Sequence, residues 1–131
     1  INDDIVRAAR DDAALTWMTD ASDADVQRLM DEADVFLSFG IEGFGIPVVE
    51  AVRRGTPVLF GGTQPAAKAL VGVGAIDVGG DDVDAISRGL RDYASPSSVQ
   101  TITWAVEPLR VPQWRDFAQG LQDVVAEVTQ H

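Results

Sequence analysis

Two glutamates, Glu42 and Glu50, lie with seven residues between them in the stretch SFGIEGFGIPVVEAVRRGTPVLF, which also holds several glycines. The second glutamate stands in an otherwise apolar run, PVVEAV. A carboxylate buried there without hydrogen-bond donors would cost several kcal/mol and would favour its protonated form. The pattern therefore favours a ligand whose hydroxyl groups, such as paired sugar hydroxyls, donate hydrogen bonds to these carboxylates.

The residues between the glutamates predict a site for a phosphate group. Residues 39–46 are expected to form a loop that leads into a helix beginning at Pro47. Gly43 and Gly45 carry no side chains, so a ligand can approach the backbone amides there. The first turn of a helix adds unpaired N–H groups and a partial positive charge. Glycines are also common in strand–helix turns, so the glycines alone are a weak indication of phosphate.

Two interpretations of the glutamates remain open at this point. In the first, Glu50 is buried in its helix and accepts hydrogen bonds from paired sugar hydroxyls. In the second, Glu50 bonds backbone amides at the positive end of the helix, an interaction worth ~0.3–1 kcal/mol. Glu42 is then a solvated loop carboxylate.

Alternating strand and helix patterns predict the elements that hold this loop. Short apolar runs bounded by turn residues predict strands at residues 14–18, 34–38, 57–60 and 75–79. Helices are expected from Ser22 to about Ala33, from Pro47 to Gly55, from Pro65 and from Asp82. The order predicts a single α/β domain, a Rossmann-like parallel sheet with flanking helices. The sheet part covers about residues 1–94, and C-terminal helices near 98–108 and after Pro112 form a tail over about 95–131.

Composition narrows the classes of function. The chain is 46% hydrophobic and 24% charged, as expected of a packed domain, and its net charge of −11 disfavours nucleic acid as a partner. It has no cysteine and a single histidine, His131, which argues against thiol chemistry and a histidine-based site. No metal is expected, because the adjacent acids, such as Asp81 and Asp82, fit helix starts better. No segment approaches ~20 apolar residues, so a cytoplasmic or membrane-peripheral protein is expected.

The stretch EGFGIPVVEAVRRGTPVL, from Glu42 to Leu59, resembles the motif of retaining GT-B glycosyltransferases of family 4 (group 1). In that family a glutamate, seven residues and a second glutamate lie within a pattern close to E-G-F-G-x-P-x-x-E-A…G-T-P-V. The flanking segments SDADVQRLMDEADVFLS, VGVGAIDVGGDDVDAISRGL and QWRDFAQGL are similar to the neighbouring parts of the same lobe. The resemblance implies the C-terminal, nucleotide-sugar-binding lobe, without its first strand and helix.

The resemblance also implies roles for individual residues. Glu50 would hold the ribose hydroxyls of a nucleotide diphosphate sugar, the donor substrate. Glu42 would be the catalytic carboxylate that orients the sugar or stabilises charge at its anomeric carbon. The backbone of Gly43, Phe44, Gly45 and Ile46 would face the sugar and phosphates. The sugar would pass with retention to a glycan or lipid-linked acceptor, with no further cofactor, and the missing N-terminal lobe would be required for activity.

Two departures from the family pattern, besides the missing first strand and helix, keep other functions in view. SFGI at 38–41 replaces the usual Pro-Ser, and residues 61–72 contain no carboxylate. The basic residues Lys68, Arg53 and Arg54 could reach phosphate, but the arginines fit better as solvated residues at a helix end. The alternatives are a non-catalytic GT-B lobe acting as a binding or assembly module, or another GT-B nucleotide-sugar enzyme such as an epimerase.

The tryptophans have two interpretations, stacking on a sugar or packing in the core. Trp17 falls in a predicted strand and Trp114 on an apolar helix stripe, so core packing is favoured for both. Trp104 is expected to cover the surface that the absent lobe would contact.

Overall fold

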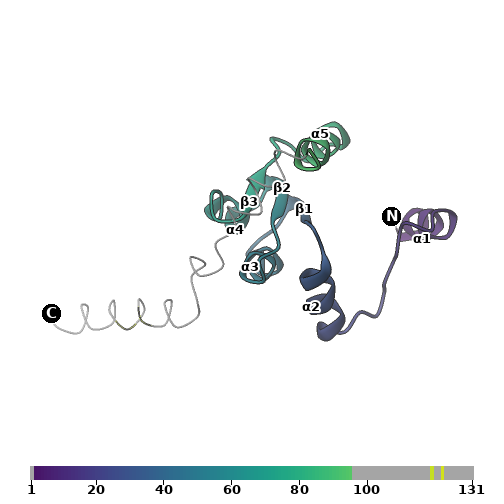
Figure 1. The fold of residues 1–131 in the computed structure, drawn as a ribbon, viewed down its shortest axis with the longest axis horizontal. Coiled ribbons are helices and arrows are strands. Elements are labelled where there is room, and N and C mark those ends of the chain that lie inside the picture. Colours follow the sequence, from purple (N-terminus) through teal and green to yellow (C-terminus); the bar gives the residue numbers. More distant parts are fainter. Residues whose placement is uncertain (1, 96–118, 120–121, 123–131) are drawn as a thin grey trace.

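The computed structural model describes residues 2–95 together with Gln119 and Gln122. Along the chain its elements are α1 (Asn2–Asp11), α2 (Asp23–Glu32), β1 (Phe36–Ile41), α3 (Ile46–Arg53), β2 (Val58–Thr63), α4 (Pro65–Ala69), β3 (Ala75–Asp77) and α5 (Val83–Tyr93). Strands and helices alternate from β1 to α5 (Figure 1). The C-terminal helices expected near 98–108 and after Pro112, with Trp104 and Trp114, lie outside the described residues.

The three strands form one parallel sheet in the order β1-β2-β3. β1 and β2 pair along their whole length, from Phe36 opposite Val58 to Ile41 opposite Thr63. β3 adds a shorter ladder that begins with Ala75 opposite Val58. The predicted α/β class with a parallel sheet and flanking helices is confirmed, and the small open sheet is consistent with a Rossmann-like arrangement.

Paired glycines carry β1 and β2 farther than the sequence predicted. The expected loop began at residue 39, yet the ladder continues to Ile41. Gly40 and Gly62 lie opposite each other with φ of +92° and +85°. A Cβ on Gly62 would come within 2.4 Å of the Gly40 carbonyl oxygen, so this close approach of two backbones requires glycine. The connection to α3 is therefore only Glu42–Gly45.

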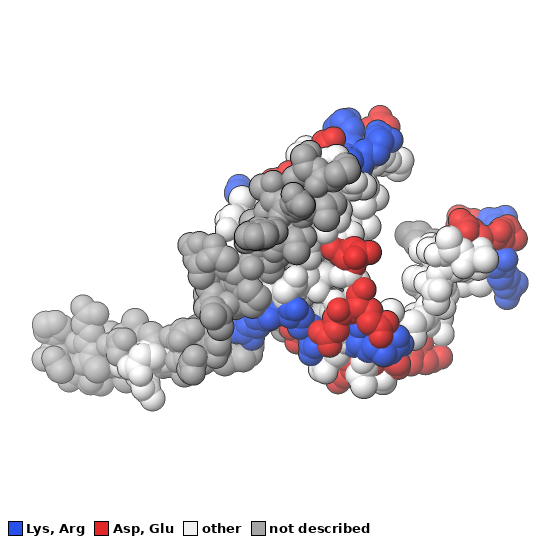
Figure 2. Space-filling view, in the orientation of Figure 1, with Lys and Arg blue, Asp and Glu red and all other residues white. Residues whose placement is uncertain are grey.

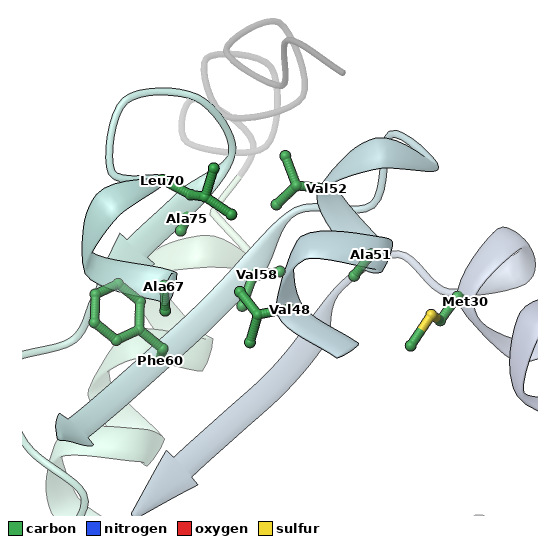
Figure 3. Packing of buried hydrophobic residues seen from close by; sticks show 9 residues of the cluster. All are labelled: Met30, Val48, Ala51, Val52, Val58, Phe60, Ala67, Leu70 and Ala75. Atoms are coloured by element: carbon green, nitrogen blue, oxygen red, sulfur yellow. The ribbon is translucent and has the colours of Figure 1, made fainter. Parts of the chain in front are cut away.

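One face of the sheet packs against α3 and α4 and forms the main core (Figure 3). Val58 and Phe60 alternate along β2 and point to this face, as the two-residue period of a strand requires. The remaining members come from four other elements or their flanks: Met30, Val48, Ala51, Val52, Ala67, Leu70 and Ala75. Met30 belongs to α2, which therefore lies beside α3 on the same face.

The opposite face of the sheet is covered by α5. Leu59, which lies between Val58 and Phe60 in β2, lines a small hollow with Gly89 and Tyr93 of α5. The Tyr93 hydroxyl donates a 2.6 Å hydrogen bond to the carbonyl oxygen of Asp34, just before β1. Burial of the phenol and the nearby Asp34 carboxylate raise the pKa of Tyr93. The sheet is thus covered on both sides, as predicted for parallel strands.

Side-chain caps begin two helices where the sequence predicted them. The Ser22 hydroxyl accepts a hydrogen bond from the Asp25 amide, and the Asp25 carboxylate accepts one from the Ser22 amide. This reciprocal pair is a capping box. At α5 the Asp82 carboxylate accepts from the Ala85 amide at 2.9 Å. The predicted stop of α3 is also confirmed, since Gly55 follows it with φ of +86°.

The predicted strand at residues 14–18 is wrong. Leu15–Met18 have no regular structure, and Leu15, Trp17 and Met18 are 44%, 41% and 39% exposed. Trp17 is therefore not a core residue, contrary to expectation. A strand needs a neighbour to satisfy its backbone groups, and in the described residues this segment has none. The helix α1 precedes it and stands apart from the sheet in Figure 1.

Because two capping carboxylates, those of Asp25 and Asp82, have lowered pKa values, we expect the fold to lose stability in acid. Hydrogen bonds from Ser22 lower the pKa of Asp25, and the hydrogen bond from the Ala85 amide lowers the pKa of Asp82. A lowered folded-state pKa contributes stability above the unfolded-state value of about 3.9, and this contribution is lost as pH falls through the folded-state pKa. Urea unfolding of Asp82→Asn should therefore depend less on pH below about 4 than that of the natural chain. Asp84→Asn, which keeps the cap, is the control; equal pH profiles for the natural chain and Asp82→Asn would contradict this.

Candidate functional site

All three strands end at one edge of the sheet, and the candidate site lies there. Because the strands are parallel, the loop Glu42–Gly45 after β1, Gln64 after β2 and the segment 78–82 after β3 share this edge. Ligands of open parallel sheets bind beyond the carboxyl ends of the strands. The edge is therefore where the predicted site residues were expected, and Glu42, Gly43, Phe44 and Gly45 all lie on it.

The two loop glycines differ in what requires them. Gly45 is buried, has φ of +69° and ψ of +40°, and is the N-cap residue of α3. A Cβ there would lie 3.0 Å from the Cβ of Ala66, so backbone conformation and packing explain Gly45. Gly43 is exposed, and a Cβ added to it would meet nothing within 4 Å. The open space next to the loop backbone is thus at Gly43.

Glu42 is exposed, and both its backbone and its side chain help to shape the loop. Its amide donates a 3.0 Å hydrogen bond to the carbonyl oxygen of Thr63, which extends the β1–β2 ladder by one step. Its Oε1 accepts a 3.0 Å bond from the Gly43 amide. The carboxylate is therefore accessible to a ligand, which would compete with the Gly43 amide for Oε1.

The predicted burial of Glu50 is wrong, because the side chain is exposed. α3 buries Val48, Ala51 and Val52, which lie on one side of the helix at spacings of three and four residues. Position 50 is two residues from both valines and therefore faces away from the sheet. Burial energetics do not demand a ligand at Glu50. Glu50 lies one turn into α3, near the loop, so its predicted role as a ligand-binding carboxylate stays a prediction.

The start of α3 differs from those of α2 and α5 because no side chain caps it. Pro47 stands in the first turn and has no N–H to offer. The Gly45 carbonyl accepts from the Val48 and Val49 amides at 3.1 and 3.3 Å, so the helix begins regularly. Apolar side chains border this start, with Phe44 67% and Ile46 49% exposed.

The arginines of α3 lie at the end of the helix remote from the loop. Arg54 donates to both carboxylate oxygens of Asp31 in α2, at 2.7 and 2.9 Å. Arg53 is in the last turn of α3, eight residues beyond Gly45, which is roughly 12 Å along a helix. The predicted place of both arginines at the helix end is confirmed, but their predicted solvation is not. Arg53 is half-buried, and the Arg54 guanidinium pairs with Asp31 and joins α3 to α2. Lys68, in the last turn of α4, is exposed.

Charges of both signs are mixed on the visible face of the molecule. Figure 2 shows Lys and Arg beside Asp and Glu over α1, α2 and α5. Ion pairs such as Arg28 with Glu32 and Arg54 with Asp31 account for part of this mixing. Among the described residues no group of three or more histidine, cysteine, aspartate or glutamate side chains could hold a metal ion. The same part of the chain contains no helix with the length and apolar character to cross a bilayer.

Gln64, which no sequence pattern singled out, is the one side chain at this edge that is both polar and almost fully buried in the described structure. Its Oε1 accepts a 3.0 Å hydrogen bond from the Ser38 hydroxyl. The available signal was a glutamine directly before a helix-opening proline, a position where serine, threonine or aspartate would be the usual cap. A glutamine in this position that does not cap the helix is expected to bond a residue of another element, as Gln64 bonds Ser38.

Comparisons of the chain with protein-family models, with curated proteins and with solved structures found no match.

Proposed function

We propose that this chain is the donor-binding part of a retaining glycosyltransferase, which transfers a sugar from a nucleotide diphosphate sugar to a glycan or lipid-linked acceptor. The observation that carries the proposal is the position of the segment from Glu42 to Glu50. It forms a strand–loop–helix connection at the carboxyl edge of a parallel sheet, and its helix begins without a side-chain cap. The motif in that segment resembles the family 4 GT-B pattern.

In this proposal each site residue except the buried Gly45, which shapes the loop, acts through a group that is accessible. The exposed Glu42 carboxylate orients the donor sugar or stabilises charge at its anomeric carbon. The open backbone at Gly43, beside the exposed Phe44, admits the sugar and phosphates, and the partial positive charge at Ile46 favours the diphosphate. The exposed Glu50 carboxylate accepts hydrogen bonds from the ribose hydroxyls. The nucleoside diphosphate leaves without a strong protein acid.

The proposed partner of this chain is an N-terminal lobe that carries the acceptor site. The outer edge of β1 has no paired strand in the described structure. Two apolar residues of this strand are exposed, Leu37 at 42% and Ile41 at 89%. The chain alone is expected to transfer no sugar, and transfer by the isolated chain would contradict that view.

A non-catalytic binding module is the second candidate, favoured by the placement of the cations. Arg54 is engaged by Asp31, and Arg53 lies at the far end of α3. Without these arginines, a diphosphate at the loop would depend on backbone amides and the exposed Lys68 for neutralisation, unless the proposed lobe supplies basic residues. Nucleotide-sugar binding separates the two candidates.

The test is ligand-observed NMR of the chain with UDP-, GDP-, ADP- and CDP-sugars, repeated with Glu50→Gln. Hydrogen bonds to a charged group are worth ~1.5–3 kcal/mol, so the variant should bind the selected nucleotide about 10- to 150-fold more weakly. Glu32→Gln, an exposed glutamate in α2, is the matched control and should bind as the natural chain does.

Each outcome of the binding experiment leads to a different conclusion about the two candidate functions or about Glu50. Selective binding that Glu50→Gln weakens and Glu32→Gln does not would support the donor site and identify the base. Equal binding by all three proteins would remove Glu50 from the site. If no nucleotide sugar binds to the chain, even when the complete protein is tested, the binding-module candidate is favoured over the transferase.

A further inference from the structure

Gln64 uses both ends of its buried side-chain amide at the end of β1. The side chain is 5% exposed. Its Oε1 accepts from the Ser38 hydroxyl at 3.0 Å, and its Nε2 donates to the Gly40 carbonyl oxygen at 3.5 Å. The Gly40 carbonyl can only accept, so the amide nitrogen must face it and the amide oxygen is left for Ser38. The amide thus links the start of α4 to two alternate residues of β1.

Gln64 holds the N-cap position of α4 but does not cap that helix. Its side chain is directed to β1 instead. The residues around it contact both ends of the glutamate–glycine loop: the Thr63 carbonyl accepts from the Glu42 amide at 3.0 Å, and the Ala66 Cβ lies against Gly45. The segment Thr63–Ala66 therefore supports the loop at its entry and at its exit.

Through the Gly40 carbonyl, the Gln64 side chain contacts β1 close to the start of the loop. Gly40 has φ of +92° and no side chain to restrain it, and it lies two residues before Glu42. A Cβ would meet nothing within 4 Å there, and the Gly40 carbonyl oxygen lies close to Gly62 within the β1–β2 ladder. The hydrogen bond from Gln64 Nε2, long at 3.5 Å, adds a side-chain restraint to the Gly40 carbonyl beside the ladder that already holds Ile41 opposite Thr63.

We infer that Gln64 is a positioning residue that sets the conformation of the loop Glu42–Gly45 and so the direction of the Glu42 carboxylate. Its consequence for ligand binding rests on the proposed function, whereas its effect on the loop does not. Gln64 touches no reacting group in this scheme. It acts through Gly40 and Ser38.

The test compares backbone amide hydrogen exchange in the natural chain and in Gln64→Leu, which has a similar size and no amide. The Glu42 amide, hydrogen-bonded to Thr63, reports on the loop, and the Val58 amide, bonded to the Gly74 carbonyl, reports on the core. Loss of a buried hydrogen bond should raise exchange at Glu42 relative to Val58 roughly tenfold. The amide shifts of Gly43 and Gly45 should change as well.

Thr56→Val is the matched control, since it removes another buried hydrogen bond, from the Thr56 hydroxyl to the Met30 carbonyl at 2.6 Å. It should destabilise the fold without raising exchange at Glu42 relative to Val58. Ser38→Ala, which removes one of the two partners of Gln64, should have an intermediate effect. An unchanged Glu42/Val58 ratio in Gln64→Leu, or the same rise in Thr56→Val, would overturn the inference.

Binding provides the second arm of the test. If the natural chain binds a nucleotide sugar, Gln64→Leu should bind it about tenfold more weakly, and equal affinity would overturn the positioning role. If neither the natural chain nor the complete protein binds one, the proposed function fails, while the exchange ratio still decides whether Gln64 holds the loop.

Discussion

Replacement of Phe60 by alanine is expected to lower the free energy of unfolding by about 3–5 kcal/mol. Phe60 is 1% exposed and is the largest fully buried side chain in the described structure. It extends from the central strand into the cluster beneath α3 and α4, where Val48 and Ala67 lie around it (Figure 3). Truncation leaves a cavity that the sheet and two helices, fixed by hydrogen bonds, cannot close.

Such a loss would remove a large part of the total stability, because domains are stable by about 5–15 kcal/mol. Phe44→Ala provides a control with the same change in side chain, since Phe44 is 67% exposed. It should alter the unfolding free energy by about 0.5 kcal/mol or less. Urea unfolding followed by far-UV circular dichroism gives both values. A Phe60→Ala loss no larger than that of Phe44→Ala would show that this core is packed differently.

Addition of one methyl group at Gly61 is expected to destabilise the fold by about 3 kcal/mol or more. A Cβ on Gly61 would lie 1.8 Å from the Gly80 carbonyl oxygen and 3.1 Å from the Phe39 ring. Gly61 does not have a positive φ, so the cost is steric and not conformational. A backbone carbonyl cannot rotate away as a flexible side chain can, and the segment after β3 would have to move.

Gly43→Ala is the control for this prediction. Gly43 also lacks a positive φ, and a Cβ there meets nothing within 4 Å. Its unfolding free energy should stay within about 0.5 kcal/mol of the natural value. The same urea measurements compare the two variants. If Gly61→Ala were as stable as Gly43→Ala, the Gly80 carbonyl would not lie against Gly61 of β2 as it does in this structure.

The local parts of the fold were predictable because their causes lie within a few residues of each other. The Ser22–Asp25 capping box, the Asp82 cap and the stop at Gly55 are all confirmed. Each depends on hydrogen bonds or backbone angles inside one turn, which the sequence specifies directly. The alternation of these helices with apolar strands was enough to predict the parallel α/β class.

Features that depend on a neighbour were decided by the tertiary structure. The run LTWM has the composition of a strand, but β1 pairs only with β2 among the described residues, so Trp17 stays exposed. The apolar sequence around Glu50 suggested burial, yet only the side of α3 that carries Val48 and Val52 meets the sheet. A sequence gives the polarity of a residue and does not show which side of its helix another element will cover.

The candidate site divides in the same way. The motif from Glu42 to Glu50 and its position before a helix could be recognised from the sequence alone. The roles of Gly40, Gly62 and Gln64 could not, because their partners lie about two dozen residues away and meet only when β1 and β2 pair. The sequence by itself determined which residues form the loop, and only the tertiary structure decided what holds it, because hydrogen bonds between distant segments require the assembled sheet.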